Sequence, residues 1–490
     1  MAEKNGKKLK KEMDEMTTKL GYFQRVLKNY KVPIMIVFEG VHASGKGMLA
    51  NEVLMALDAR YTKFYATHAP TADELRKPFL WQYAINTPST KEIYVYYRSW
   101  YSLYIAMKNK TVENSKYKDP EILVKEMENF ETILKNSGTE LIKFYIEIDK
   151  DKQMEHIKKM YDNPRTMWKA QEYDKDNDED YQKSMEEMVK KDQDSWKIIK
   201  MEDDDKSIHE IFSHLVETLE ERVKKEEEKE ASRPPKRDGF FNGVYPNILE
   251  DFEDSEDISK DLYREKIEML QNELREIQYT LYERKIPLIL VYEGWDAAGK
   301  GGNIRRAVKR LDPTGYEIHT TAAPTEVELS HHYLWRFWKD LPRSGHIGIR
   351  DRSWYGRVMV ERVEGFATNE EVKRAYGEIN GFEESLTNFG SIVIKFFIHI
   401  SKEEQLARFK ARQEDENKVW KITDEDWRNR DKWSLYEEAI NDMLNLTSKE
   451  TAPWHVINGN SKRYARVKAL EIIIETCYKT LFPENLNKDK

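Results

Sequence analysis

The sequence has almost no cysteine and no long hydrophobic run. Cys477 is the single cysteine among 490 residues, which excludes a disulfide framework and a multi-cysteine metal site and fits a reducing compartment. No apolar stretch approaches the ~18 residues of a membrane-spanning helix. The first residues, MAEKNGKKLKKEMDEM, contain no hydrophobic segment of the secretory type. These absences predict a cytoplasmic protein without a membrane partner.

An excess of basic residues is also missing. Lysine and arginine number 81, aspartate and glutamate 89, and the net charge is −8. Nucleic-acid-binding domains are usually net basic, so this balance argues against a nucleic-acid partner. A polyanionic substrate is not excluded, because a local basic channel can lie within an acidic protein. At about 100–200 residues per domain, the length predicts two or three domains, each able to bury a core.

The chain contains one internal repeat. The segment KVPIMIVFEGVHASGKG, which begins at Lys31, returns as KIPLILVYEGWDAAGKG at Lys285, with 9 of 17 positions identical. The same offset of 254 residues relates RSWY at Arg98 to RSWY at Arg352. The offset falls by two further on, where KFYIEI in the first half matches KFFIHI in the second. We therefore predict a tandem duplication.

The seam between the repeats has the composition of a linker. A block of like charges and a Pro-Pro pair, ERVKKEEEKEASRPPKRD, favour a solvated segment over a core element. The predicted organisation is a first domain at 1–225, a linker at 226–257 and a second domain at 258–490.

Strand and helix patterns alternate within each half. Nearly unbroken apolar runs, such as 392–400, are typical of strands that are buried on both faces of a sheet. In the second half the expected order is helix 262–284, strand 287–292, helix 303–310, strand 317–321, helix 326–338, strand 346–350 and strand 392–400. This alternation predicts an α/β fold with a parallel sheet flanked by helices.

A glycine-rich loop joins the strand at 287–292 to the next helix. It reads GWDAAGKGG, and its spacing and context are those of a phosphate-binding P-loop. In such a loop backbone N–H groups and the helix N-terminus face an anion, and the lysine reaches the phosphoryl oxygens. The predicted phosphate-binding residues are Gly294, Ala297, Ala298, Gly299, Lys300, Gly301 and Gly302.

The hydroxyl group that usually follows a P-loop lysine is absent. Serine or threonine there normally holds Mg²⁺, but this chain has Gly301. Two acids are candidate ligands for Mg²⁺, or for Mn²⁺ in its place: Asp296 within the loop, and Asp351 at the end of strand 346–350. A structural role stays open for each, Asp351 as a partner of a neighbouring arginine and Asp296 as a brace of the loop.

Basic residues follow the predicted strands. Arg352 and Arg357 come directly after Asp351, and Arg408 and Arg412 are four residues apart, on one helix face. The same segment continues with Lys418, Lys421, Arg428 and Arg430. A mobile basic lid over phosphates explains this segment, since phosphoryl transfer depends on positioning and charge neutralisation. An ordinary solvated helix with internal ion pairs is the alternative.

Together these segments resemble the polyphosphate kinase 2 family. The strings EGWDAAGKGG, TAAPT, DRSWYGR and VERVEGF, and a basic segment ending in VWK, occur in the order that the family has. The resemblance implies a P-loop kinase-like fold with a helical lid, Mg²⁺ dependence, and phosphoryl transfer between inorganic polyphosphate and nucleotides. It further implies that Lys300 is the loop lysine, that Asp296 and Asp351 are metal and catalytic positions, and that Arg352, Arg357 and Arg412 face the transferring phosphates.

The duplicated architecture resembles the fused members of the family. It implies phosphorylation of AMP to ADP with polyphosphate as donor, and it suggests a homo-oligomer. A polyphosphate-dependent nucleoside diphosphate kinase, an ATP-dependent P-loop kinase and a non-enzymatic polyphosphate-binding scaffold are the alternatives.

The first half lacks the acids that this chemistry requires. It keeps Lys46, but His42 replaces Asp296 and Tyr97 replaces Asp351, while Met160 stands where Arg412 is expected. Histidine and tyrosine are poor replacements for anionic Mg²⁺ ligands. We therefore predict a catalytically silent first domain.

Overall fold

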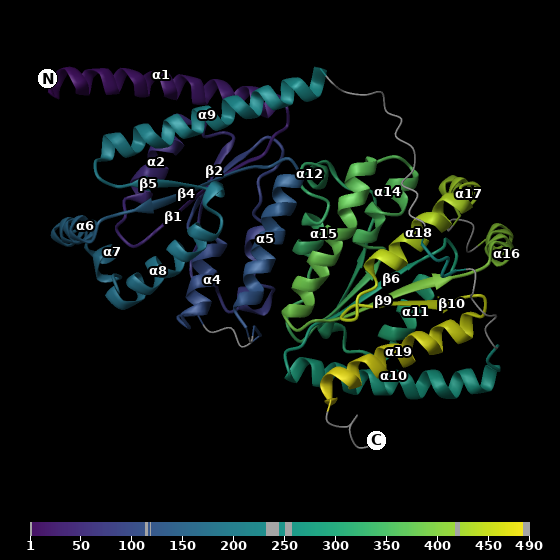
Figure 1. Ribbon diagram of the computed structural model, residues 1–490. Coiled ribbons are helices and arrows are strands. Elements are labelled where there is room, and N and C mark those ends of the chain that lie inside the picture. The colour runs from purple at the N-terminus through teal and green to yellow at the C-terminus, as the bar shows by residue number, and fades with distance from the viewer. Residues whose placement is uncertain are drawn as a thin grey trace. The chain divides into compact units, whose positions relative to one another are not determined.

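Each repeat folds around a five-stranded parallel sheet (Figure 1). The computed structural model describes residues 2–112, 116–117, 119–231, 245–249, 257–416 and 422–483. The strand order is β2-β3-β1-β4-β5 in the first repeat and β7-β8-β6-β9-β10 in the second. The two orders are equivalent, so the predicted duplication of an α/β domain with a parallel sheet is confirmed.

The first sheet is covered by helices on both faces (Figure 1). Its strands are β1 (Ile34–Gly40), β2 (Thr62–Ala66), β3 (Ile93–Tyr97), β4 (Glu140–Glu147) and β5 (Trp196–Lys200). One face carries α1 (Ala2–Asn29), α2 (Lys46–Ala56) and α9 (Asp204–Ala231), and the other carries α4 (Trp100–Lys108), α5 (Glu121–Asn136) and α8 (Lys175–Lys191). The short α3 (Trp81–Ala84) precedes β3, and α6 (Lys150–Asp162) and α7 (Met167–Gln171) follow β4.

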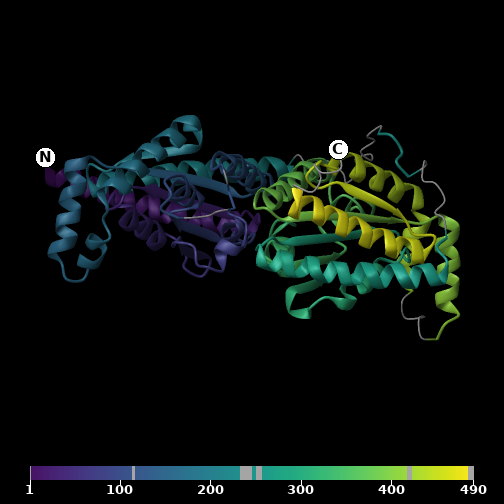
Figure 2. The same ribbon diagram turned by 90° about the horizontal axis from the view of Figure 1, so that it is seen from below.

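The second sheet has the same layers. Its strands are β6 (Leu288–Gly294), β7 (Tyr316–Thr320), β8 (Ile347–Asp351), β9 (Ile392–His399) and β10 (Trp454–Asn458). One face carries α10 (Lys260–Glu283), α11 (Lys300–Ala307) and α19 (Lys462–Leu481); the other carries α14 (Val360–Val363), α15 (Asn369–Asn388) and α18 (Trp433–Thr447). Figure 2 shows α10 and α19 side by side. The helices α16 (Lys402–Gln413) and α17 (Asp424–Asp431) lie between β9 and α18 in the chain.

The central strand β6 brings the candidate site residues together. Its side chains from Leu288 to Tyr292 are almost fully buried, as expected for a strand covered on both faces. In the parallel ladder Tyr292 is paired with Asp351 at the end of β8. The loop after β6 and the acid that ends β8 therefore meet at the carboxyl edge of the sheet, where ligands of open α/β sheets bind.

One predicted helix is wrong in its extent. The segment 326–338 forms two short helices, α12 (Glu326–Leu329) and α13 (Trp335–Lys339), with an irregular stretch between them. The Ser330 hydroxyl donates to the carbonyl of Val327 at 2.7 Å, and this local bond competes with continuation of the helix. The apolar spacing that predicted a single helix reflects burial of Phe337 and Trp338 in the second piece.

The chain divides into two compact units that exchange short segments. The first unit contains Met1–Thr71, Leu80–Lys236 and Thr325–Trp335, and the second contains Ala72–Phe79, Arg237–Pro324 and Arg336–Lys490. Helix α9 continues to Ala231, while 232–244 and 250–256 of the predicted linker lie outside the described residues. The boundaries at 225 and 258 stay a prediction. In the part of the chain that the structure describes, no helix is long and apolar enough to cross a membrane.

A buried ion pair joins α15 to the second sheet. Lys395 Nζ lies 2.7 Å from Glu383 Oε2, and both side chains are almost completely buried. The other carboxylate oxygen of Glu383 accepts hydrogen bonds from the side chains of Trp354 and Tyr355 at 2.9 and 2.7 Å. These bonds tie the RSWY segment, which follows Asp351, to the core.

Replacing Glu383 with alanine is expected to destabilise the second repeat strongly. The change leaves the buried ammonium group of Lys395 without its counter-charge, and such a loss costs about 3–5 kcal/mol. Urea denaturation of the full chain measures the effect. The control is Glu370→Ala on the same helix, because Glu370 pairs with Lys373 at the surface, where ion pairs contribute about 0–1 kcal/mol. Equal stability of the two variants would contradict this account of the core.

Candidate active site

The loop between β6 and α11 curls around the amine of Lys300. Lys300 Nζ donates to the carbonyl oxygens of Gly294 at 2.6 Å and Trp295 at 3.2 Å. Gly294 has a φ of 146°, and a Cβ there would collide with the backbone of Ile398. Gly299 has a φ of 111° and caps the helix that begins at Lys300. The glycines are thus required by the backbone path, as the P-loop pattern predicts.

Arg408 on α16 supports the backbone of this loop through hydrogen bonds. This side chain is 6% exposed, and its Nε donates to Glu404 at 2.6 Å. Its terminal nitrogens donate to four carbonyl oxygens, those of Ala297, Ala298, Gly459 and Asn460. Direct phosphate binding, predicted from the sequence, would require Arg408 to give up these partners. In this structure Arg408 holds the loop backbone.

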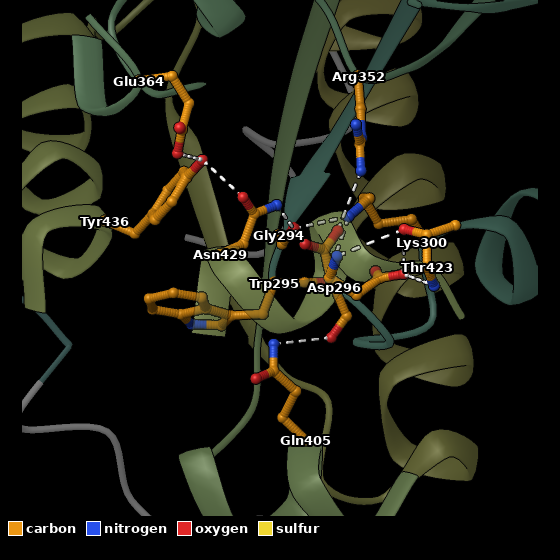
Figure 3. Close-up of polar contacts among 11 residues, drawn as sticks. Gly294, Trp295, Asp296, Lys300, Arg352, Glu364, Gln405, Thr423, Asn429 and Tyr436 are labelled. Carbon is orange, nitrogen blue, oxygen red and sulfur yellow. Dashed lines mark hydrogen bonds and ion pairs between the residues drawn. The ribbon is translucent and has the colours of Figure 1, made fainter. Parts of the chain in front are cut away.

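The two predicted acids lie near Lys300. Asp296 Oδ1 accepts from Arg352 Nη2 at 3.0 Å (Figure 3). Asp351 Oδ2 lies 3.9 Å from the position that a Cβ on Gly301 would occupy, which places it beside the missing hydroxyl position. Burial alone would raise the pKa of the Asp296 carboxyl, but Lys300 and Arg352 outweigh burial and hold that pKa below its ordinary value. The site therefore presents Asp296 as a carboxylate.

Arg352 is held in an unusual backbone conformation. Its φ is +65°, a region that non-glycine residues seldom occupy. The backbone N–H of Arg352 donates to Tyr292 at 3.1 Å, and its carbonyl accepts from the Thr321 hydroxyl at 2.9 Å. The next side chain, Ser353, donates to the buried carboxyl of Glu293 at 2.8 Å. The equivalent Arg98 of the first repeat has the same conformation. In the second repeat this conformation places Arg352 where its side chain bonds to Asp296.

The other predicted basic residues have different surroundings. Arg357 Nη1 pairs with Glu361 at 3.0 Å. Arg412 lies in the last turn of α16, beside Arg408, and Lys421 lies outside the described residues. At the start of α19, burial lowers the pKa of Lys462. The positive charges of nearby arginines, Arg412 among them, lower this pKa further.

Sequence reasoning missed this basic contribution from α19. The guanidinium of Arg466 lies 3.5 Å from the position of a Cβ on Gly302, next to the first turn of α11. The segment SKRYARVK carried the signal, but the short strand β10 before it was not predicted, so its place at the carboxyl edge was not apparent. Gln405 and Asn429 were also missed, because their partner Asp296 lies more than a hundred residues away in the sequence. Tyr436, which contacts Asn429, was missed with them.

The sequence matches the family model described as Polyphosphate kinase 2 twice, over residues 3–228 and 257–482. The chain belongs to the polyphosphate kinase 2 family. The matches cover both repeats, so the resemblance seen in the second half extends to the first half.

Named relatives are similar along nearly the whole chain. The polyphosphate:AMP phosphotransferase of Pseudomonas aeruginosa is 35% identical over 461 residues, which is 92% of each chain. That of Acinetobacter johnsonii is 37% identical over 448 residues, 90% of each chain. A crystal structure of a polyphosphate kinase 2 from Pseudomonas aeruginosa superimposes with a TM-score of 0.82 and 32% identity, covering 97% of this chain and 96% of that chain. The predicted P-loop kinase-like fold agrees with this similarity.

The donor set of the second repeat fits a divalent cation that also binds substrate. Within the described ranges no group of three or more acidic, histidine or cysteine side chains forms a ready-made metal site. The chain offers two carboxylates, Asp296 and Asp351, which both interact electrostatically with the P-loop lysine. Mg²⁺ commonly takes one or two carboxylates together with water and substrate phosphates, so the residues present fit such an ion.

The first repeat fills the equivalent space with its own side chains. Lys46 is 2% exposed, and its amine donates to Val41 at 2.8 Å. Tyr97, which replaces Asp351, places its ring 5.1 Å from this amine. Burial, reinforced by Arg98, lowers the pKa of Lys46 to about 7. At neutral pH this lysine is therefore only partly charged, and an aromatic ring stands where the second repeat has Asp351.

Proposed function

We propose that this protein transfers the terminal phosphoryl group of inorganic polyphosphate to AMP and forms ADP. The observation that carries the proposal is the similarity to named polyphosphate:AMP phosphotransferases through both repeats. Of the alternatives considered from the sequence, a scaffold without activity fits poorly, because the second repeat retains its lysine, both acids and Arg352 in one place.

The site residues have separate roles in an in-line displacement. An oxygen of the AMP phosphate forms a bond to the terminal phosphorus while the bond to the bridging oxygen of the polyphosphate breaks. Lys300 and the loop amides hold the phosphates, and Arg352 neutralises charge on the equatorial oxygens. Asp296 and Asp351 would hold Mg²⁺, which would supply further charge neutralisation. The attacking phosphate is already anionic, so little general-base help is needed.

The first repeat is proposed to be catalytically silent. Its P-loop lysine is buried against Tyr97, which stands at the position of Asp351. The position of Asp296 is held by His42, whose backbone N–H donates to Asp178 at 2.8 Å. Asp178 is thus engaged by the loop backbone, and by Gln153 Nε2 at 2.5 Å. Homo-oligomer formation and a cytoplasmic location stay predictions from the sequence.

A donor–acceptor matrix tests the proposed function. AMP, ADP, GMP and GDP are each incubated with polyphosphate and Mg²⁺, and nucleotide products are separated by chromatography. ADP formed from AMP is expected to be the dominant product, and chelation of Mg²⁺ is expected to abolish it. Faster conversion of ADP to ATP would favour a nucleoside diphosphate kinase instead. Turnover with ATP as donor and none with polyphosphate would favour an ATP-dependent kinase.

A further inference from the structure

The carboxylate of Asp296 has a second partner on the far side from Arg352. Asn429 Nδ2, on α17, donates to Asp296 Oδ2 at 3.0 Å, while Arg352 takes Oδ1. Figure 3 shows the two side chains approaching the carboxylate from different sides. Both oxygens of this acid are thus oriented by donors from separate elements, one after β8 and one on α17.

The amide of Asn429 is itself held in one orientation. The Tyr436 hydroxyl on α18 donates to Asn429 Oδ1 at 3.2 Å, with Glu364 Oε1 3.5 Å away. Lys432 Nζ anchors the other oxygen of Glu364 at 2.7 Å. Because the Asp296 carboxylate can only accept, the NH₂ group of Asn429 must face it, which leaves Asn429 Oδ1 for the Tyr436 hydroxyl. The chain of contacts shown in Figure 3 thus fixes the donor toward the acid.

The first repeat provides an internal comparison. Gln405 Nε2 donates to the backbone carbonyl of Asp296 at 3.1 Å, and its counterpart Gln153 donates to the carbonyl of His42 at 2.8 Å. The bond that supports the loop backbone is therefore present in both repeats. In the first repeat the loop is contacted from the following helix by Asp178 on α8, which accepts from the backbone N–H of His42 at 2.8 Å. The helix thus bonds to the loop backbone in the first repeat, and to the carboxylate of Asp296 in the second.

The position of α17 gives this contact a further meaning. The helix begins after a capping box at Thr423, directly beyond the basic segment that ends near Lys421. Arg430 on the same helix also donates to Gln405 Oε1 at 3.1 Å. Helix α17 therefore carries Asn429, which contacts Asp296, and bonds to Gln405, which also contacts Asp296. The position of α17 and the orientation of the Asp296 carboxylate therefore depend on each other.

We propose that Asn429 is a positioning residue that holds the Asp296 carboxylate for a divalent cation and couples it to the placement of α17. This inference rests on the role given to Asp296 in the proposed function. Partners that orient a metal-binding carboxylate typically change metal affinity or activity by about 10–100-fold when removed. Asn429 acts through Asp296 and Tyr436 acts through Asn429.

The test compares Asn429→Ala, Tyr436→Phe and the double variant of the full chain. The Mn²⁺ affinity of the protein alone is measured by electron paramagnetic resonance, and the Mg²⁺ concentration for half-maximal rate is measured separately. Asn429→Ala is expected to weaken Mn²⁺ binding and raise that Mg²⁺ concentration about ten-fold or more. Tyr436→Phe is expected to cause a smaller change, and the double variant to resemble Asn429→Ala, because the two residues act in series.

The control is Asn445→Ala on α18, since Asn445 donates to the carbonyls of Pro246 and Asn441 and should leave both readouts unchanged. Unchanged metal affinity in a folded Asn429→Ala variant would overturn the proposal. Tighter Mn²⁺ binding would also overturn it, because the amide would then compete with the cation. If the wild-type protein binds no Mn²⁺, the proposal fails with its premise. If it binds Mn²⁺ but forms no ADP, only the proposed function fails.

Discussion

Replacing Asp351 with asparagine is expected to lower kcat by about 10²–10³-fold, which is typical for loss of one electrostatic contact at a transferring group. The amide keeps the shape of the side chain but removes the negative charge. Asp351 ends β8 beside Gly301, where the chain has no hydroxyl group to hold a cation. Of the two acids expected to bind the cation, Asp296 alone would then keep its negative charge.

Steady-state rates at saturating polyphosphate and AMP measure this effect, and thermal melting verifies that the variant is folded. Asp312→Asn is a matched control. Asp312 caps the turn before β7 by accepting from Thr314 at 2.9 Å, a bond that asparagine can also accept, and it lies at the opposite edge of the sheet. Wild-type turnover in a folded Asp351→Asn variant would contradict the role assigned to this acid.

Removal of the P-loop lysine is expected to have opposite consequences in the two repeats. Lys300→Met should reduce kcat by about 10³-fold, because the cation that holds the phosphoryl oxygens is lost. Lys46→Met should leave the rate nearly unchanged. Methionine retains the length of the side chain, and burying an apolar group in place of a partly desolvated amine avoids an unpaired charge.

The same assay, run on both variants with thermal melting, separates activity from folding. Lys46 has a pKa lowered to about 7, and its amine lies near the Tyr97 ring and not near an acid at the position of Asp351, so its loss should not affect a metal-assisted transfer. A large fall in rate for a folded Lys46→Met variant would show that the first repeat takes part in catalysis. The proposed silent role would then have to be abandoned.

The parts of the fold that could be predicted from the sequence are those governed by local pattern. Strands β6, β8 and β9 were expected within two residues of where they occur, because strands buried on both faces read as unbroken apolar runs. The P-loop could be recognised because its glycines stand where the backbone path admits no larger residue. The segment 326–338 was misjudged, because the apolar spacing outweighed the bond that Ser330 makes to its own backbone.

The candidate site was predicted in its loop and its acids, but not in its supporting contacts. Arg408 illustrates the difference: its spacing from Arg412 suggested a phosphate contact, whereas the structure shows it bonded to carbonyls of the loop. Asn429 carried no sequence signal at all. A polar residue on a charged helix is usually solvated, and its link to Asp296 depends on how α17 packs.

By itself the sequence determined the duplication, the alternation of strands and helices that predicts a parallel sheet, the P-loop, and which repeat retained a pair of acids. These features depend on the spacing of residues within short segments, because backbone geometry and hydrophobic periodicity are local properties. Only the tertiary structure decided which side chains hold Asp296 and which brace the loop. Those partners come from α16 and α17, more than a hundred residues further along the chain, and long-range contacts of this kind exist only once the helices are packed against the sheet.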